Sequence, residues 1–277
     1  MKVKVLDHTS RNRLVTWLAC AGLTTGCALT PAARFEATAG AQGLRADTVT
    51  GDGFEHRVYS RRAPGSDRVH VYFGSDGSPF LQRTRIAPDP TPRRALTLTL
   101  MARDPHALAL LGRPCYHGLR ANCTPELWTV GRYSETVVAS MTAATERLLA
   151  AYPDATVVLV GYSGGGTLAL LVAERLAAVD AVVTVAANLD TAAWTRRHGY
   201  TPLAQSLDPV AVAGNRPGLR HRHFTGSDDD NVPPSLHRRL RERLPEGAFT
   251  TVPGYDHRCC WVERWPERLE RALREMP

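Results

Sequence analysis

The short segment GYSGG, residues 161–165, places a single serine between glycines. The apolar run TVVLV before it is typical of a buried strand, and TLALLVAERLAAV after it favours a helix. A strand that turns directly into a helix through G-x-S-x-G holds the serine in a strained turn, where its hydroxyl is presented as a nucleophile. The backbone N–H of the next residue, Gly164, would then face a developing oxyanion. The pattern predicts covalent catalysis by Ser163.

Two kinds of phosphate-binding loop are the alternatives for the same glycines. A Walker loop needs a lysine where Thr167 stands, so the contact with the terminal phosphates would be missing. A dinucleotide fingerprint, G-x-G-x-x-A, fits Gly164, Gly166 and Ala169, with Asp190 near the end of the next strand. Its first glycine, however, comes several residues after the strand ends. A dinucleotide-binding oxidoreductase therefore stays open as a lesser alternative.

A serine hydroxyl needs a base, and a carboxylate must orient that base. Where such a turn carries the nucleophile, the acid follows it in the chain and the histidine comes last. His257 lies in the loop after the last expected strand, which makes it the candidate base. Spacing alone does not decide which carboxylate orients the base. Asp228, Asp229 and Asp230 are adjacent, and Asp190 follows an earlier expected strand.

Alternating expected strands and helices must position these side chains. The sequence predicts a mostly parallel, doubly wound α/β sheet flanked by helices. The expected strands are 54–60 (at an edge), 68–74, 95–102, 156–160, 181–187, 219–226 and 248–252. The expected helices are 134–152 with Ser134 as N-cap, 167–179, 235–244 and 261–276.

From about residue 50 to its end, the chain resembles the α/β-hydrolase superfamily. Many members carry G-x-x-D-x-x-V-P at the acid loop, and Gly226, Asp229, Val232 and Pro233 match it. The resemblance therefore implies Asp229 as the acid and an esterase-like serine hydrolase that needs no cofactor. The runs GRPCY, GYSGGG and HRCCW also resemble those of a group of exported, lipoprotein-like bacterial proteins, which implies the same fold but names no substrate.

The same resemblance suggests where the rest of the site lies. The second oxyanion donor should follow the strand 68–74, where relatives often have a His-Gly motif and this chain has FGSDG at 73–77. The backbone N–H of Ser75 or Asp76 is the candidate donor. We expect the Asp76 carboxylate to turn away, because it would oppose an oxyanion. A short cap is expected over residues 191–217, with Trp194, Tyr162 and Tyr116 as candidate pocket residues.

The N-terminus has the pattern of an export signal. Residues 1–26 combine a basic start, a short apolar run and small residues, and LTTGC resembles a lipobox that would lipidate Cys27. A simple cleaved signal is the alternative, since Thr24 stands where such boxes usually have Leu or Val. We expect an envelope protein anchored by lipid and facing the periplasm, with a tether over 27–48 and the hydrolase domain over 49–277.

Composition limits the partners. The net charge of +7 falls when the basic signal is removed, and no basic run is interleaved with aromatics, so we expect no nucleic-acid partner. No obligate protein partner is expected either, only an acyl substrate. An oxidising compartment favours a Cys115–Cys123 disulfide, with the pairing of Cys259 and Cys260 open and no zinc-type spacing. A lipid-anchored binding protein on a catalytically silent scaffold remains the main alternative.

Overall fold

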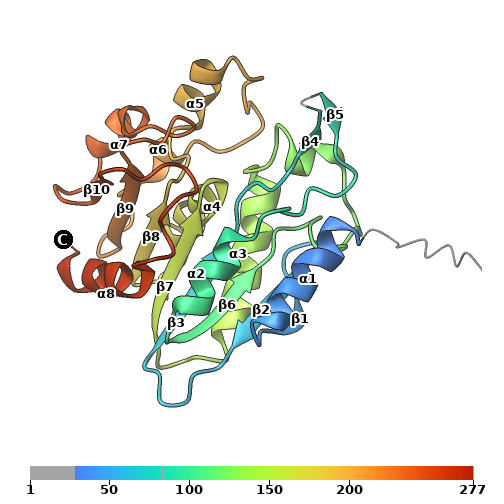
Figure 1. The fold of residues 1–277 in the computed structure, drawn as a ribbon, viewed down its shortest axis with the longest axis horizontal. Helices are drawn as coiled ribbons and strands as arrows, with labels where there is room; N and C mark the ends of the chain where they lie inside the picture. The colour runs from blue at the N-terminus through green and yellow to red at the C-terminus, as the bar shows by residue number, and fades with distance from the viewer. Residues whose placement is uncertain (1–28, 83, 277) are drawn as a thin grey trace, which may run out of the picture.

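An eight-stranded sheet forms the centre of the computed structural model, which describes residues 29–82 and 84–276 (Figure 1). Its strand order is β1-β2-β6-β3-β7-β8-β9-β10, and all neighbours from β6 to β10 are parallel. The two antiparallel pairs of this sheet are β1–β2 and β2–β6. The strands are β1 Arg45–Thr50, β2 Glu55–Arg61, β3 Arg68–Phe73, β6 Ala107–Leu111, β7 Thr156–Tyr162, β8 Ala181–Val185, β9 Arg220–Gly226 and β10 Phe249–Val252. This confirms the predicted mostly parallel α/β architecture.

Helices cover both faces of the sheet (Figure 1). Helices α3 and α4 pack on one face with α6 and α7, and helices α1, α2 and α8 pack on the other. The bounds are α1 Pro31–Ala41, α2 Leu96–Arg103, α3 Glu135–Leu149, α4 Gly164–Ala173, α5 Thr191–His198, α6 Pro209–Val212, α7 Arg238–Arg241 and α8 Trp265–Glu275. Short 3₁₀ helices span Pro125–Trp128 and Pro234–His237, and a small hairpin joins β4 Phe80–Leu81 to β5 Arg85–Ile86.

The central strands are buried on both faces, as their continuous apolar runs predict. In β3, Val69, Val71 and Phe73 point to the α3–α4 side, and Tyr72 points to the α2–α8 side. The same alternation in β7 sends Leu159 to the first core and Val158 to the second. Because packing on both faces fixes the position of β7, it also fixes the position of the turn that follows this strand.

Two expected strands are wrong in type or place. The expected strand 95–102 is replaced by helix α2, Leu96–Arg103, although LTLTL at 96–100 alternates with a period of two. Its Leu98, Leu100 and Met101 pack in the α2–α8 core, so tertiary packing overrides the local pattern. The strand at this point of the sheet is β6, which follows α2 directly. Strand β2 is not an edge strand, because β1 pairs with its outer side.

Most of the expected tether, residues 27–48, is folded: helix α1 and the first residues of strand β1 lie within it. Thr30 caps helix α1 by accepting a hydrogen bond from the Ala33 N–H, and Pro31 occupies the first turn. Phe35 and Ala39 are buried, and the Phe35 ring packs against Tyr59 with centroids 5.5 Å apart. Strand β1 then extends the sheet. The expected helix 235–244 is also divided, into the 3₁₀ turn Pro234–His237 and the single-turn α7.

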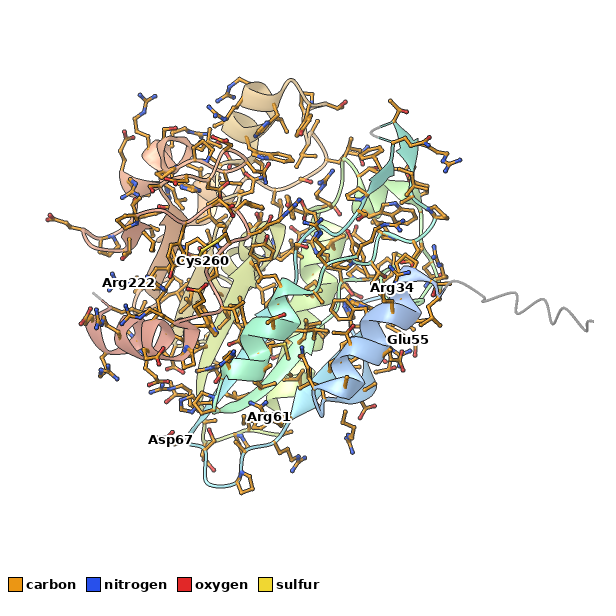
Figure 2. All side chains as sticks on the ribbon, in the orientation of Figure 1. Arg34, Glu55, Arg61, Asp67, Arg222 and Cys260 are labelled. Carbon is orange, nitrogen blue, oxygen red and sulfur yellow. A yellow bond between two sulfur atoms is a disulfide. The ribbon has the colours of Figure 1, made fainter. Side chains whose placement is uncertain are left out.

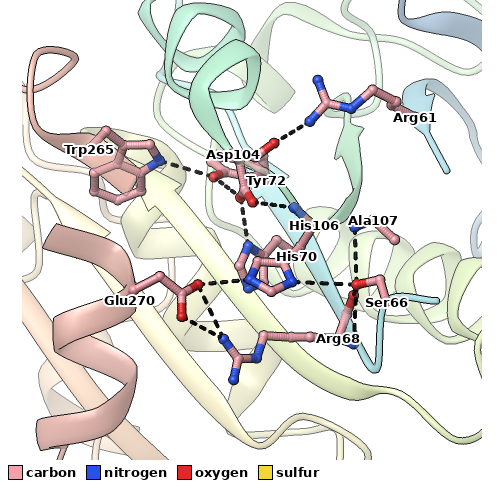
Figure 3. Close-up of polar contacts among 10 residues, drawn as sticks. All are labelled: Arg61, Ser66, Arg68, His70, Tyr72, Asp104, His106, Ala107, Trp265 and Glu270. Atoms are coloured by element: carbon pink, nitrogen blue, oxygen red, sulfur yellow. Dashed lines mark hydrogen bonds and ion pairs between the residues drawn. The ribbon is translucent and has the colours of Figure 1, made fainter. Parts of the chain in front are cut away.

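A buried polar network holds α8 against β3 at the amino ends of the parallel strands. The chain enters β3 at this end, near Arg61 and Asp67 (Figure 2). Asp104 accepts hydrogen bonds from the Tyr72 hydroxyl at 2.5 Å and from His70 Nδ1 at 2.6 Å, and the Trp265 indole donates to the Tyr72 oxygen at 3.1 Å (Figure 3). The network links β3, through His70 and Tyr72, to the end of helix α2 and to helix α8.

The predicted signal peptide and the lipidated Cys27 lie outside the described residues, so they stay predictions. Within the described ranges, no helix combines the length and apolar character needed to cross a bilayer.

Candidate active site

The turn between β7 and α4 carries Ser163 in a conformation that L-residues rarely adopt. Its φ is 54° and its ψ is −128°, and such strain is typical of functional positions. The surrounding glycines make the turn possible: a Cβ on Gly161 would lie 2.4 Å from the Gly166 Cα, and one on Gly165 would lie 2.1 Å from the Phe73 carbonyl oxygen. The glycines therefore let strand, helix and the neighbouring β3 end approach closely, with the Ser163 side chain projecting outward.

Three distant side chains meet at this turn. The Ser163 Oγ lies 3.1 Å from His257 Nε2, and His257 Nδ1 lies 2.9 Å from Asp229 Oδ2. A carboxylate only accepts, so Nδ1 carries the ring proton and Nε2 is free to accept from the serine hydroxyl. The Asp229 side chain is fully buried and that of His257 is 16% exposed. The arrangement suits abstraction of the Ser163 proton.

Asp229 is the acid that reaches His257. Its Oδ1 accepts hydrogen bonds from the N–H groups of Asn231 and Val232, which leaves Oδ2 for the imidazole. Asp228 instead accepts from the Ser227 hydroxyl. Asp190, which ended the preceding strand in the sequence, caps helix α5 and forms an ion pair with Arg239. Asp230 is exposed.

Asn231 also contacts the imidazole, which sequence reasoning did not foresee. Its Nδ2 lies 3.1 Å from His257 Nε2, and its Oδ1 lies 3.4 Å from the Trp194 indole nitrogen. Because an indole N–H only donates, the Asn231 oxygen faces Trp194 and its amide nitrogen faces His257. Its backbone carbonyl accepts from His198 Nε2 at 2.8 Å. Asn231 thus connects helix α5, which begins the segment expected to form a cap, to the candidate base.

The backbone amides that follow β3 and β7 lie at one edge of the sheet, where these two neighbouring strands end. The chain leaves these two neighbouring strands toward opposite sides of the sheet, a switch point at which α/β sheets form ligand crevices. In the part of the chain that the structure describes, the amides of Ser75, Asp76 and Gly164 donate no hydrogen bond. Gly164 begins α4, so its N–H has no acceptor within the helix. These amides are free to bind an oxyanion.

The Asp76 side chain does not turn away from this region, contrary to our expectation. A Cβ on Gly164 would lie 1.9 Å from Asp76 Oδ1, so the carboxylate lies directly against the Gly164 backbone. Its charge is countered by Arg113 at 2.7 Å and Arg132 at 3.0 Å, two residues that the sequence analysis missed. Burial alone would raise the pKa of Asp76, but the two guanidinium groups hold it below its usual range.

Of the three expected pocket residues, two serve other contacts. Tyr162 is buried and donates its hydroxyl proton to the His257 carbonyl at 3.0 Å, which supports the histidine loop from below. Tyr116 is buried behind the β3 loop and donates to the Asp76 carbonyl at 2.9 Å. Trp194 is half-buried in α5 beside Asn231, and Tyr200, also in the cap segment, is 52% exposed.

Disulfides brace both loops that flank the site. The predicted Cys115–Cys123 bond is confirmed and closes the segment that carries Tyr116. Cys259 and Cys260 bond to each other, two residues beyond His257, in the connection between β10 and α8 (Figure 2). The Asp256 carboxylate accepts from the backbone N–H groups of Cys259 and Arg258, which lower the pKa of Asp256. The loop around His257 is therefore locally fixed.

The glycines of the dinucleotide alternative face protein atoms. A Cβ on Gly164 would meet Asp76, and one on Gly166 would lie 2.3 Å from the Ala187 Cβ. A fingerprint glycine instead gives its space to a pyrophosphate. Over residues 29–82 and 84–276, no group of three His, Cys, Asp or Glu side chains is arranged to hold a metal ion.

Sequence comparison gives a partial match to a lipase family. The family model described as Lipase (class 3) matches residues 115–192, the segment that contains the Ser163 turn. No curated protein sequence matches the chain.

Structural comparison shows the α/β-hydrolase fold. A Pyrococcus furiosus esterase superimposes with a TM-score of 0.59 at 11% identity, covering 83% of this chain and 90% of the esterase. An α/β serine hydrolase without a lid from Xanthomonas campestris gives 0.52 at 15% identity, with 83% and 92% covered. An α/β serine hydrolase homologue from Coxiella burnetii gives 0.54 at 12% identity, with 83% and 96% covered. At these identities the similarity describes the fold alone.

Proposed function

We propose that this chain is a serine hydrolase that cleaves carboxylic esters through an acyl-enzyme. The observation that carries the proposal is the linked geometry of Ser163, His257 and Asp229, with a hydrogen bond at each ring nitrogen of the histidine. The strained backbone of Ser163 adds independent support, because non-glycine residues held at positive φ cluster at functional sites.

Acylation begins when Ser163 Oγ attacks the carbonyl carbon of the substrate. His257 Nε2 takes the hydroxyl proton as the new C–O bond forms, and Asp229 stabilises the resulting imidazolium while holding Nδ1–H in place. The carbonyl oxygen becomes an oxyanion that the Gly164 amide and the Ser75 or Asp76 amide bind. The tetrahedral intermediate collapses, and His257 returns the proton to the departing alkoxide.

Deacylation repeats these steps with water as the nucleophile. His257 takes a proton from water, the hydroxide adds to the acyl carbon, and Ser163 leaves with the proton that His257 gives back. The products are a carboxylic acid and an alcohol, and the enzyme returns to its starting state.

An ester is the substrate class that the proposal favours, although thioesters and amides would use the same residues. The match of residues 115–192 to the lipase family model supports this order. The test is a panel of nitrophenyl esters of increasing acyl length, matched thioesters and anilides, with the Ser163→Ala variant as control. Turnover of esters that is absent in Ser163→Ala supports the proposal, whereas equal turnover in both proteins contradicts it.

We further propose that the enzyme is exported and anchored through lipid on Cys27, as its N-terminal pattern suggests. Expression of the full chain and of Cys27→Ser, followed by detergent-phase partitioning, tests this separately from activity. Partitioning of the parent chain, lost in Cys27→Ser, supports the anchor. Recovery of both proteins in the aqueous phase contradicts it.

A further inference from the structure

The Asp76 carboxylate is the centre of a polar cluster beside the proposed oxyanion site. Its two oxygens contact Arg113 at 2.7 Å, Arg132 at 3.0 Å and the Tyr133 hydroxyl at 2.8 Å. Its own carbonyl accepts the hydrogen bond from Tyr116. The loop after β3 is therefore held through the side chain and the backbone of the same residue. We refer to Asp76, Arg113 and Arg132 as the Asp76 cluster.

The Asp76 cluster touches the backbone on which the oxyanion would rest. A Cβ on Gly164 would lie 1.9 Å from Asp76 Oδ1 and 2.5 Å from the Tyr133 hydroxyl. The residue after the nucleophile is glycine because this carboxylate and this hydroxyl occupy the space that a side chain would need. The position of Asp76 and that of the Gly164 amide are thus mutually fixed.

The Asp76 cluster carries more positive than negative charge. The Arg113 and Arg132 side chains are 5% and 9% exposed, and each carries one positive charge against the single negative charge of Asp76. Tyr116 and Tyr133 stay neutral, because burial raises the pKa of Tyr116 to about 12 and that of Tyr133 above its usual range. Within the described residues, all three Arg113 guanidinium nitrogens are buried without a hydrogen-bond acceptor, and Nη2 contacts Asp76 Oδ1 as an ion pair at 2.7 Å. One positive charge is therefore left without a counterion.

Burying charges costs several kcal/mol per ion, so a purely structural cluster of this kind is an expensive way to hold a loop. A fixed positive charge in a water-poor site becomes useful when negative charge develops nearby. The hydrolysis proposed above develops a negative charge on the oxyanion, next to the Gly164 amide.

We propose that Arg113 and Arg132 are positioning residues of the hydrolase. They hold Asp76 so that the Ser75–Asp76 amides face the oxyanion, and their excess positive charge stabilises it. The inference rests on the proposed hydrolase function. It concerns the transition state, so it predicts an effect on kcat and little effect on KM.

The test compares charge-keeping and charge-removing variants at the same positions. In Arg113→Met and Arg132→Met, kcat for a nitrophenyl ester should fall by ~10- to 100-fold while KM stays within about twofold. Arg113→Lys and Arg132→Lys should recover part of that loss. A boronic acid, which forms a tetrahedral adduct with the serine, should lose affinity in the same order as kcat. Arg175→Met, which breaks the more exposed Arg175–Glu135 ion pair, should leave kcat unchanged.

Several outcomes would overturn the inference. Equal kcat for the Met and Lys variants would show that the positive charge does not stabilise the oxyanion. Boronate affinities that do not follow kcat would show the same. Folding is checked by thermal melting, and if a Met variant does not fold, the Lys variant and the other arginine carry the test. If the parent protein hydrolyses no ester and forms no boronate adduct, the proposed function itself has failed. If the parent is active and all folded variants match it, only this inference is wrong.

Discussion

The Asn231 amide nitrogen lies 3.1 Å from His257 Nε2, the same nitrogen that faces Ser163 Oγ at 3.1 Å. Two donors therefore share one lone pair of the proposed base. The Asn231 oxygen is held by Trp194 of helix α5, so the cap segment influences the histidine through a single side chain. This relationship makes Asn231 the most direct point at which to test how the base is tuned.

Replacing Asn231 with aspartate should make the enzyme dependent on higher pH. The new carboxylate would lie beside His257 Nε2 and stabilise the imidazolium, which cannot accept the serine proton. We expect the acidic limb of the kcat/KM profile to move up by about one pH unit or more. Asn215→Asp, at a residue that contacts Arg243, is the matched control and should leave the profile in place. An unmoved profile in Asn231→Asp would contradict the proposed contact.

The three neighbouring aspartates should differ sharply when neutralised. Asp229→Asn should lower kcat by about 10⁴-fold, the loss found when the acid of a serine–histidine–aspartate group becomes an amide. Asp228→Asn and Asp230→Asn change the same charge nearby and should cost little, because neither side chain reaches His257. Steady-state kinetics of the three variants, with melting curves as folding checks, decide the assignment. A larger loss in Asp228→Asn or Asp230→Asn than in Asp229→Asn would show that the acid is misassigned.

Adding one methyl group at Gly164 should damage the site. The new Cβ would meet Asp76 Oδ1 at 1.9 Å and must displace the carboxylate or the α4 backbone. We expect Gly164→Ala to lose most of its kcat. Separately, overpacking should lower its free energy of unfolding by about 1–3 kcal/mol. Gly40→Ala is the matched control: its Cβ would meet nothing within 4 Å in helix α1, and it should stabilise the fold by about 0.5–1 kcal/mol. Retained kcat in Gly164→Ala would contradict the packing described.

Stability should fall as the pH drops from about 6.5 toward 4. Burial lowers the pKa of His56 to about 4, although the Gly112 carbonyl at Nδ1 opposes that shift. The unfolded chain binds a proton near pH 6.5 and the folded chain does not, so folding is disfavoured below that pH. For His56 alone the loss at pH 5 is about 2 kcal/mol. Burial lowers the pKa of His117 to about 3 and that of His237 to about 4, so both act in the same direction.

Denaturant unfolding between pH 8 and pH 5 measures this effect. In His56→Gln the slope of the unfolding free energy against pH should fall by about 1.36 kcal/mol per pH unit between the two pKa values. This corresponds to one proton fewer taken up on unfolding. Identical slopes for the variant and the parent would show that His56 is not held neutral in the fold.

The sequence was most informative where one local pattern determined one local structure. The apolar run of β7 and the glycines at 161 and 165 together specify a sharp turn, and the structure has that turn. The order of Ser163, Asp229 and His257 along the chain could likewise be interpreted, because parallel strands end at the same edge of the sheet. These inferences needed only strand direction and turn chemistry.

Contacts between distant segments were beyond such reasoning. Nothing near Arg113 in the sequence shows that it would meet Asp76, because the two residues follow different strands that pair only in the folded sheet. The period-two pattern of residues 95–102 was misleading for the same reason, since its partners in the core decide its structure. Asn231 had a weak signal, because it lies two residues after the acid, but its contact with Trp194 depends on where α5 packs.

Covalent labelling of Ser163 tests the central claim most directly. The folded full chain is treated with a fluorophosphonate, and intact mass and peptide mapping locate the adduct, with Ser163→Ala and His257→Ala treated in parallel. The account predicts a single adduct on Ser163 in the parent, none in Ser163→Ala and much slower labelling in His257→Ala. Equal labelling of the parent and Ser163→Ala, or a folded parent that takes up no label, would contradict it.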